Sequence, residues 1–370
     1  MKKPKVFVAL SGGVDSSVAA ALLKKEERFD IIGAHMICWK DAVARAKNER
    51  CAAERDAEDA RRVADKLDIP FYVFDFTEEY REKVFDYMVR EYRSGRTPNP
   101  DVMCNKEIKF GIFLEKAISL GADFVATGHY ARVKNVRFEE QNTVSLYQAK
   151  DKNKDQSYFL WTLTQNQLKH ALFPIGDYTK NEVREMARKF NLPTAEKKDS
   201  QGLCFVGKID FAEFLKGLIS AHKGAAVSAA GRKIGEHDGA EFYTIGQRHG
   251  IGVGGGELPL YVAQKDIKAN VIVMVEKDNP LLYKKELMAG DINWIAGKSP
   301  KLPFKCETRV RYRQPLQEAR IMNDESRIKV VFNKPQRAVA PGQSVVFYLP
   351  AVASAKAGDK KQVLGGGIIC

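Results

Sequence analysis

The stretch Ser11-Gly12-Gly13-Val14-Asp15-Ser16-Ser17 combines residue types that bind phosphate. Its two glycines allow a tight turn and a close backbone approach, and its serines can donate hydrogen bonds to phosphate oxygens. The stretch lacks the Gly-Lys-Ser/Thr ending of a Walker loop, so the usual ATPase grip on the β- and γ-phosphates is not indicated. An ordinary strand-to-helix turn with Ser/Asp capping is the alternative.

Two of the six cysteines, Cys104 and Cys204, are candidates for reactive thiols. Cys104 follows a proline-rich loop and is predicted to lie at the start of a helix, beside Lys106. The helix N-terminus and the lysine charge both favour the thiolate form of this cysteine. Cys204 lies among apolar residues, so a buried inert thiol is an equal alternative on local grounds. A pair of thiols could exchange sulfur through a disulfide or persulfide, but only if folding brings their Cα atoms within about 7 Å.

The elements that must position these residues alternate between strand and helix. Apolar runs predict strands at 6–10, 31–37, 71–74 and 124–127, and helical spacing predicts helices beginning near 15 and covering 49–67, 78–93 and 106–120. This alternation predicts an α/β fold with a doubly wound parallel sheet and helices on both faces. The ligand of such a sheet binds at the carboxyl ends of its strands, where the first Gly/Ser turn lies.

The pattern changes after the last of these strands. A β-hairpin is predicted over 131–148, and helices over 165–172 and 180–191. Residues 200–265 are glycine-rich and mixed, and from 271 onward short alternating segments predict a small all-β barrel. We therefore predict a catalytic domain over 1–199, a small central domain over 200–270 and a C-terminal β-barrel over 271–370.

The 370-residue chain carries a formal charge of +13, which predicts a polyanionic partner. Arg309, Arg311 and Arg313 alternate, which predicts three arginines on one strand face that follows phosphates; a solvated strand face is the alternative. No apolar run approaches the roughly 18 residues that span a bilayer, and the first strand begins too early for a signal peptide. We expect a cytoplasmic protein with no membrane partner.

Further short motifs follow the phosphate-binding stretch in a fixed order. They are Asn99-Pro100-Asp101 with Cys104-Asn105, Ala126-Thr127-Gly128-His129-Tyr130-Ala131-Arg132, Lys154-Asp155-Gln156-Ser157-Tyr158, Ser200-Gln201-Gly202 with Cys204-Phe205, and Tyr243-Thr244-Ile245-Gly246-Gln247-Arg248. The first stretch alone resembles the PP-loop of ATP pyrophosphatases. The whole set resembles the MnmA family of bacterial tRNA-specific 2-thiouridylases, and the resemblance covers nearly the entire chain.

This resemblance implies site residues of three kinds. Cys104 matches the family's nucleophile and Cys204 its persulfide carrier. Asp101 precedes Cys104 by three residues, so we expect it to hold the uracil N3–H edge; an aspartate that stabilises the turn is the alternative. The positions that match nucleotide contacts are Ala9, Leu10, Ser11, Gly12, Gly13, Val14, Asp15, Ser16, Met36 and Gly128. The positions that match contacts with tRNA or its target base are Asn99, Pro100, Asp101, His129, Lys154, Asp155, Gln156, Arg311, Tyr312 and Gln343.

The implied reaction is 2-thiolation of a wobble uridine in tRNA, with ATP and Mg²⁺ as cofactors. Adenylation of the uracil C2 oxygen converts a poor leaving group into AMP, and a persulfide on Cys204 supplies the sulfur. Direct attack by this persulfide on C2 and release of hydrosulfide by Cys104 both remain open. Asp15 is the candidate for positioning Mg²⁺, and a helix cap is its alternative role.

The implied partners are tRNAs for lysine, glutamate and glutamine, and a cysteine desulfurase or sulfur carrier that donates the persulfide. We expect the enzyme to be a monomer. One rival interpretation is an ammonia-using PP-loop ligase, which would need neither cysteine. The other is a non-catalytic RNA-binding protein, which would consume no ATP.

Overall fold

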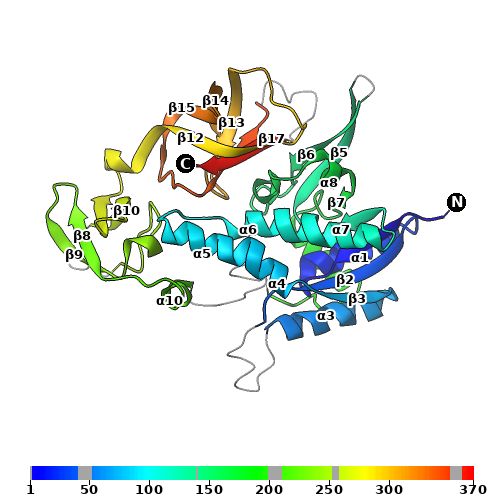
Figure 1. Cartoon of the computed structure of the whole chain (residues 1–370). Helices are drawn as coiled ribbons and strands as arrows, with labels where there is room; N and C mark the ends of the chain where they lie inside the picture. The colour runs from blue at the N-terminus through cyan, green and yellow to red at the C-terminus, as the bar shows by residue number, and fades with distance from the viewer. Residues whose placement is uncertain (1, 41–51, 139–140, 199–210, 252–257, 351–360) are drawn as a thin grey trace.

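A five-stranded parallel sheet forms the first part of the chain, as the alternation predicts. The computed structural model describes residues 2–40, 52–138, 141–198, 211–251, 258–350 and 361–370 (Figure 1). The sheet has the order β3-β2-β1-β4-β7. Its strands are β1 Lys5–Ala9, β2 Asp30–Ile37, β3 Phe71–Asp75, β4 Phe124–Ala126 and β7 Ala171–Leu172. The predicted helix over 165–172 therefore ends early, because its last two residues pair with β4 instead.

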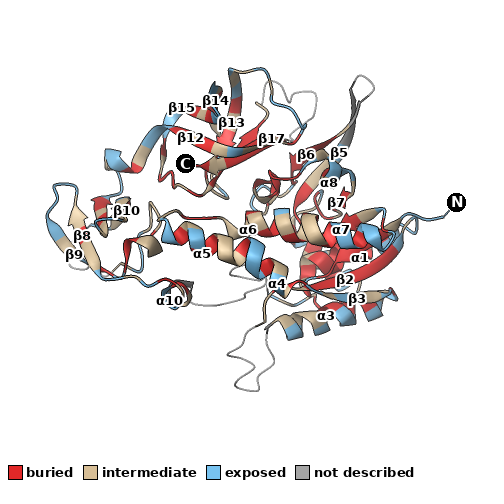
Figure 2. Ribbon diagram, in the orientation of Figure 1, coloured by how far each residue is buried: buried red, intermediate tan, exposed pale blue. Residues whose placement is uncertain are grey.

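Side chains of β1 alternate between two hydrophobic clusters, one on each face of the sheet. Phe7 and Ala9 enter one cluster, whereas Val6 and Val8 enter the other. Strands β1, β2 and β4 are mostly buried, which requires helices on both faces of the sheet, whereas the edge strand β3 is largely exposed (Figure 2). The flanking helices are α1 Val14–Lys25, α3 Ala52–Leu67, α8 Gln165–Lys169 and α9 Lys180–Lys189, with the two composite helices described next.

Two long helices each contain a π-helical segment. The first joins α4 Thr77–Tyr80, the π-helical residues Arg81–Phe85 and α5 Asp86–Arg93, and the second joins α6 Pro100–Met103, the π-helical residues Cys104–Ile112 and α7 Phe113–Ser119. The second begins six residues before the predicted start at Lys106. Asn99 caps it by accepting a bond from the Val102 amide at 3.3 Å, and Pro100 supplies a first helical residue that needs no hydrogen-bond partner.

A closed antiparallel barrel forms the C-terminal part, as predicted. Its strands are β12 Tyr283–Trp294, β13 Phe304–Arg309, β14 Gln317–Asp324, β15 Arg327–Arg337, β16 Ser344–Tyr348 and β17 Gln362–Ile369. Pairing of β12 with β17 closes the ring. The predicted hairpin, β5 Ala131–Phe138 and β6 Gln141–Gln148, joins the same sheet because β6 pairs with β17. The hairpin therefore joins the part that contains the parallel sheet to the barrel by hydrogen bonds.

The central part contains α10 Phe211–Lys216 and a four-stranded sheet of order β10-β11-β8-β9. Its strands are β8 Gly224–Ser228, β9 Lys233–His237, β10 Leu260–Asp266 and β11 Val271–Glu276. Leu215 and Ile219 pack with Met88, Val89 and Tyr92 of α5, which fixes this part against a helix of the parallel-sheet part. Among the described helices, none is long and apolar enough to cross a membrane.

The predicted arginine strand face is wrong. Strand β13 ends at Arg309, and Tyr312 and Arg313 lie in a turn where Arg313 has a φ of +64°. Arg309 is buried and Arg313 is exposed, so the three side chains do not share a surface. Alternating charged and apolar residues are typical of a half-buried strand. Here, however, Arg309 forms a buried ion pair with Asp155, and the residues after it form a turn.

Candidate active site

The Gly/Ser stretch links the carboxyl end of β1 to α1 and is held in shape by its own serines. Ser16 Oγ accepts a hydrogen bond from the Ser11 amide at 3.1 Å and donates one to the Gly13 carbonyl at 3.2 Å. Ser17 Oγ donates to the same carbonyl at 2.7 Å. Gly13 is the N-cap of α1 and no side chain caps this helix. The amides of its first turn are therefore not claimed by a cap, which is the arrangement that binds anions at helix N-termini.

Glycine is required at two positions where other backbone closes on this loop. Gly12 has a φ of +73°, and a Cβ there would lie 2.3 Å from the Asp56 carbonyl oxygen of α3. A Cβ on Gly128, which follows β4, would lie 2.6 Å from the Ser16 amide nitrogen. The structure thus brings Gly128 to the Gly/Ser stretch 11–17, which is called the phosphate loop below. Both glycines are needed for the close packing around this loop.

Replacing Gly12 by alanine is expected to destabilise the protein by at least about 2 kcal/mol, because a left-handed backbone costs about 1–2 kcal/mol and the clash with Asp56 adds to it. Gly13→Ala is the matched control: Gly13 has a φ of −99°, and its nearest contact would be Ser11 Oγ at 3.4 Å. Urea unfolding of both variants measures the difference. Equal shifts of the midpoint would show that the loop does not have this conformation.

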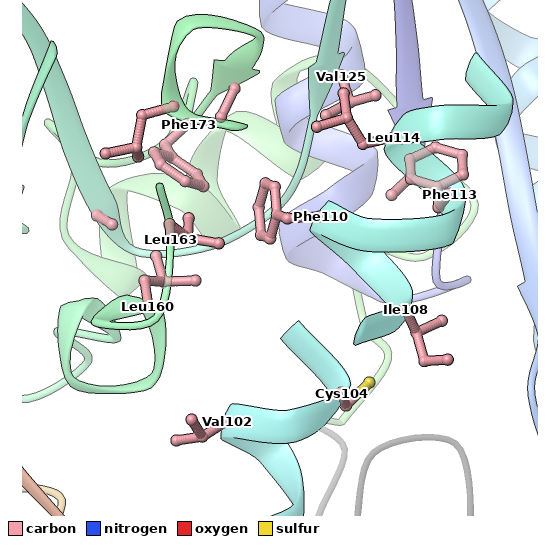
Figure 3. Packing of buried hydrophobic residues seen from close by; sticks show 14 of the residues in the cluster. Val102, Cys104, Ile108, Phe110, Phe113, Leu114, Val125, Leu160, Leu163 and Phe173 are labelled. Carbon is pink, nitrogen blue, oxygen red and sulfur yellow. The ribbon is translucent and has the colours of Figure 1, made fainter. Parts of the chain in front are cut away.

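Cys104 lies in the second turn of its helix, not at the N-terminus as predicted, and the neighbouring Lys106 ammonium pairs with Glu107 at 3.0 Å. The thiol is fully buried (Figure 3). It belongs to the same hydrophobic cluster as Ala9 and Met36, both of which are predicted to contact the nucleotide. Cys104 therefore lies in the core on the side of the sheet to which Phe7 and Ala9 of β1 contribute.

The helix that carries Cys104 runs antiparallel to the strands, so its first turn lies toward their carboxyl ends (Figure 1). Asp101 Oδ1 in that first turn is buried and has no hydrogen-bond partner among the described residues, and the same holds for Asn105 Oδ1 one turn later. Buried acceptors without a donor are costly, so two of them beside a candidate nucleophile indicate that a ligand's donors belong there. Cys204 lies outside the described residues.

The loop before Asn99 is held between the barrel and the central part. Gln343 Nε2 donates to the Thr97 and Pro98 carbonyls, both at 3.0 Å, and the Thr97 amide donates to the Pro341 carbonyl at 2.8 Å. Thr97 Oγ1 donates to Thr244 Oγ1 of the central part at 3.2 Å. Gln343 therefore supports the loop that leads to Asp101, and this junction joins all three parts.

Arg311 and Tyr312 lie at the same junction. Arg311 donates from Nη2 to the Ile245 carbonyl, and burial lowers the pKa of its guanidinium. The Tyr312 ring packs on Phe159 with 4.5 Å between ring centroids, and burial raises the pKa of its hydroxyl. Of the residues predicted near tRNA, the structure thus gathers Arg311, Tyr312 and Gln343 with the loop that ends at Asn99.

Other residues predicted near tRNA act as internal supports. Burial lowers the pKa of His129 well below its ordinary value, and the ring packs against Phe110 and Phe173. Gln156 Oε1 accepts from the Tyr130 amide at 2.9 Å. Asp155 is 1% exposed and is discussed below with its ion-pair partner. Contact of these side chains and of Lys154 with tRNA remains a prediction.

Asp15 has partners that the sequence did not predict. Its Oδ1 accepts from Lys180 Nζ at 2.7 Å and from the Tyr130 hydroxyl at 2.9 Å. Lys197 pairs with Asp56 of α3, the residue whose backbone approaches Gly12. Burial alone would lower the pKa of Lys197, but its hydrogen bonds to Asp56 and Asp59 outweigh that effect, so the pKa is raised. No periodicity in the sequence relates these lysines to a loop so far away along the chain.

Within the described ranges, no group of three His, Cys, Asp or Glu side chains could hold a metal ion. A Mg²⁺ ion at this loop would therefore take most of its ligands from phosphate oxygens, which is usual for Mg²⁺ bound with a nucleotide. Asp15 is the acidic residue of the phosphate loop and the one that could add a carboxylate oxygen.

Comparison with known proteins identifies matches over the whole chain. Three family models match: a tRNA methyl transferase HUP domain over 4–208, a tRNA methyl transferase PRC-barrel domain over 212–276 and an aminomethyltransferase beta-barrel domain over 284–369. The tRNA-specific 2-thiouridylases MnmA of Francisella philomiragia and of Francisella tularensis subsp. novicida are each 46% identical over 375 residues, covering 100% of both chains. The solved U34-tRNA thiolase NcsA of Methanococcus maripaludis is 18% identical, with a TM-score of 0.36 over 58% of this chain and 64% of its own.

Proposed function

The chain belongs to the MnmA family of tRNA-specific 2-thiouridylases, and from this premise we infer that it is the sulfurtransferase that thiolates C2 of a wobble uridine in tRNA at the expense of ATP. The observation that supports this most strongly is the position of Cys104. Cys104 belongs to the buried hydrophobic cluster that also contains Ala9, the last residue of the strand before the phosphate loop, and Met36.

The phosphate loop binds the ATP phosphates through the amides at the start of α1 and the serine hydroxyls. The uracil C2 oxygen attacks the α-phosphorus, the bond from the α-phosphorus to the bridging oxygen breaks, and pyrophosphate leaves with the electron pair. The resulting C2–O–AMP bond makes AMP the leaving group when sulfur attacks C2. Mg²⁺ would offset charge on the phosphates, with Asp15 as its protein ligand.

The sulfur is carried as a persulfide on Cys204, and Cys104 is its reaction partner. In one route the terminal persulfide sulfur attacks C2, AMP leaves, and the Cys104 thiolate then attacks the Cys204 sulfur to release 2-thiouridine. In the other, Cys104 attacks the Cys204 sulfur first, and the released hydrosulfide attacks C2. Both routes end in a Cys104–Cys204 disulfide, which an external thiol must reduce before the next turnover. Because Cys104 is fully buried, either route requires a conformational change that exposes the thiol.

The target base must leave the anticodon loop to reach this chemistry, and loop bases unstack at the lowest cost. The proposed substrates are the lysine, glutamate and glutamine tRNAs, and the proposed sulfur donor is a cysteine desulfurase or a carrier. The proposal also includes a monomeric cytoplasmic enzyme, with a catalytic domain over 1–199, a central domain over 200–270 and a tRNA-binding barrel over 271–370.

Mass spectrometry of tRNA nucleosides tests the proposal directly. Purified protein is incubated with tRNA, ATP, Mg²⁺ and a persulfide donor, and pyrophosphate release is measured in parallel. We expect 2-thiouridine in amounts that match the pyrophosphate, and neither product when ATP is omitted. Pyrophosphate without thiouridine, or no ATP consumption at all, would contradict the proposed reaction.

Asp101→Asn is expected to lower kcat/KM for thiolation about fivefold to tenfold, because a hydrogen bond to a charged acceptor exceeds one to a neutral acceptor by about 1–1.4 kcal/mol. The substitution replaces a charge-assisted hydrogen bond from the uracil N3–H by a neutral one, and a bond to a charged group is worth about 1.5–3 kcal/mol. The exposed Asp324 in the barrel offers a control, since Asp324→Asn removes a carboxylate far from the helix of Asp101. Full activity of Asp101→Asn would exclude this role for the carboxylate.

A further inference from the structure

The phosphate loop carries no positive charge of its own. From Ala9 to Ser17 its one charged residue is Asp15, which is acidic. An ATP-binding loop with only an acidic side chain needs a cation from elsewhere to offset the phosphate charge. Lys180 lies 165 positions further along the chain, and its ammonium group lies 2.7 Å from Asp15 Oδ1.

Lys180 occupies a position that is unfavourable for a lysine on local grounds. It is the first residue of α9, where the helix dipole disfavours a cation, and its side chain is 11% exposed. The capping box of this helix is complete without it, since Thr179 and Glu182 supply both reciprocal bonds. The formation of α9 therefore does not require a lysine at position 180. The contact of Lys180 with Asp15 of the phosphate loop gives a reason for a lysine at this position.

The packing of α9 on α1 fixes where this ammonium group lies. Val14 and Val18 of α1 share a buried cluster with Val183 and Ala187 of α9. Because Val14 follows Gly13 directly, this contact places the start of α9 beside the phosphate loop. The lysine is thus held by a rigid interface, which is how catalytic charges are pre-organised.

We propose that Lys180 is the cation of the phosphate loop: held by Asp15 in the free protein, its ammonium group binds the phosphates that leave as pyrophosphate. This inference rests on the proposed function, in which pyrophosphate leaves with the electron pair of the broken bond. No proton is transferred in this step; the charge of the Lys180 ammonium group offsets the negative charge that the leaving group gains.

The alternative is a structural ion pair that only fastens α9 to α1. The two roles differ in what they do to nucleotides of different length. A phosphate-binding lysine discriminates between ATP and AMP, because only ATP carries the phosphates that it binds. A structural pair has no reason to discriminate between them.

Lys180→Met and Lys180→Gln are therefore compared with the wild-type protein by isothermal titration of ATP and of AMP, each with Mg²⁺ and without tRNA. Glutamine keeps a hydrogen-bond donor for Asp15 while it removes the charge. Lys150→Met is the matched control, since the 48% exposed Lys150 side chain pairs at 2.8 Å with Glu182 of α9 and not with Asp15.

We expect both Lys180 variants to raise the Kd for ATP at least about tenfold and to change the Kd for AMP less than about twofold, since a hydrogen bond to a charged group is lost only with ATP. Lys150→Met should bind both nucleotides as the wild-type protein does. Unchanged ATP affinity, or equal losses for ATP and AMP, in the folded Lys180 variants would overturn the inference alone. A wild-type protein that binds no ATP would overturn the proposed function with it.

Discussion

Replacing Cys104 by serine is expected to reduce the rate of tRNA thiolation at least about a thousandfold, because a serine hydroxyl can neither attack a persulfide nor form a disulfide. Serine is close to cysteine in size but buries a hydroxyl in a hydrophobic cluster, at a cost of about 1–3 kcal/mol, so urea unfolding of the variant checks that it is folded. The affinities for ATP and tRNA, measured separately, should change less than about twofold. Rapid-quench measurement of 2-thiouridine gives the rate.

Two other described cysteines serve as controls for this experiment. Cys370 is exposed and free, so it is the more accessible thiol, whereas burial raises the pKa of Cys306 in the barrel to about 12. Cys370→Ser and Cys306→Ser should both retain near wild-type rates when folded. Substantial activity of Cys104→Ser, or loss of activity in Cys370→Ser, would show that the reacting thiol has been misidentified.

Replacing Arg309 by methionine is expected to destabilise the protein by about 3–5 kcal/mol, the usual cost of leaving a buried charge unpaired. Arg309 Nη1 lies 2.9 Å from Asp155 Oδ2, and the two side chains are 9% and 0% exposed. Asp155 also accepts from Gln148 Nε2 at 2.7 Å and from two backbone amides. The pair joins the catalytic part to β13 of the barrel, so urea unfolding should report the loss.

Arg28→Met provides the comparison for that measurement. Its pair with Glu26 has side chains that are 70% and 42% exposed, and exposed pairs contribute about 0–1 kcal/mol. The double variant Arg309→Met/Asp155→Asn should be more stable than Arg309→Met alone, because no charge remains unpaired. If Arg309→Met shifts the urea midpoint no further than Arg28→Met does, the buried pair does not stabilise the contact between the barrel and the rest of the protein.

The sequence was sufficient to predict the features that depend on local patterns. An apolar run before Gly12 predicted β1, and alternating segments predicted the barrel strands. The early start of the Cys104 helix could also have been predicted, since Asn followed by Pro is a common signal for the beginning of a helix. The arginine alternation failed because a turn after Arg309 interrupts a pattern that looks continuous in sequence.

The contacts that complete the site could not be predicted from any local pattern. The bonds between Lys180 and Asp15, Arg309 and Asp155, and Gln343 and Thr97 span 165, 154 and 246 positions. Such pairs depend on how α9, β13 and the loop before β16 pack in three dimensions. Motifs could therefore suggest which residues react, but only the fold shows which residues hold them in place.

The most direct test is to search for a Cys104–Cys204 disulfide after a single turnover without added reductant, by peptide mass spectrometry. We predict that the disulfide forms in amounts that match the 2-thiouridine produced, and only when ATP, tRNA and the persulfide donor are all present. Formation of 2-thiouridine while both cysteines remain free thiols would contradict the account.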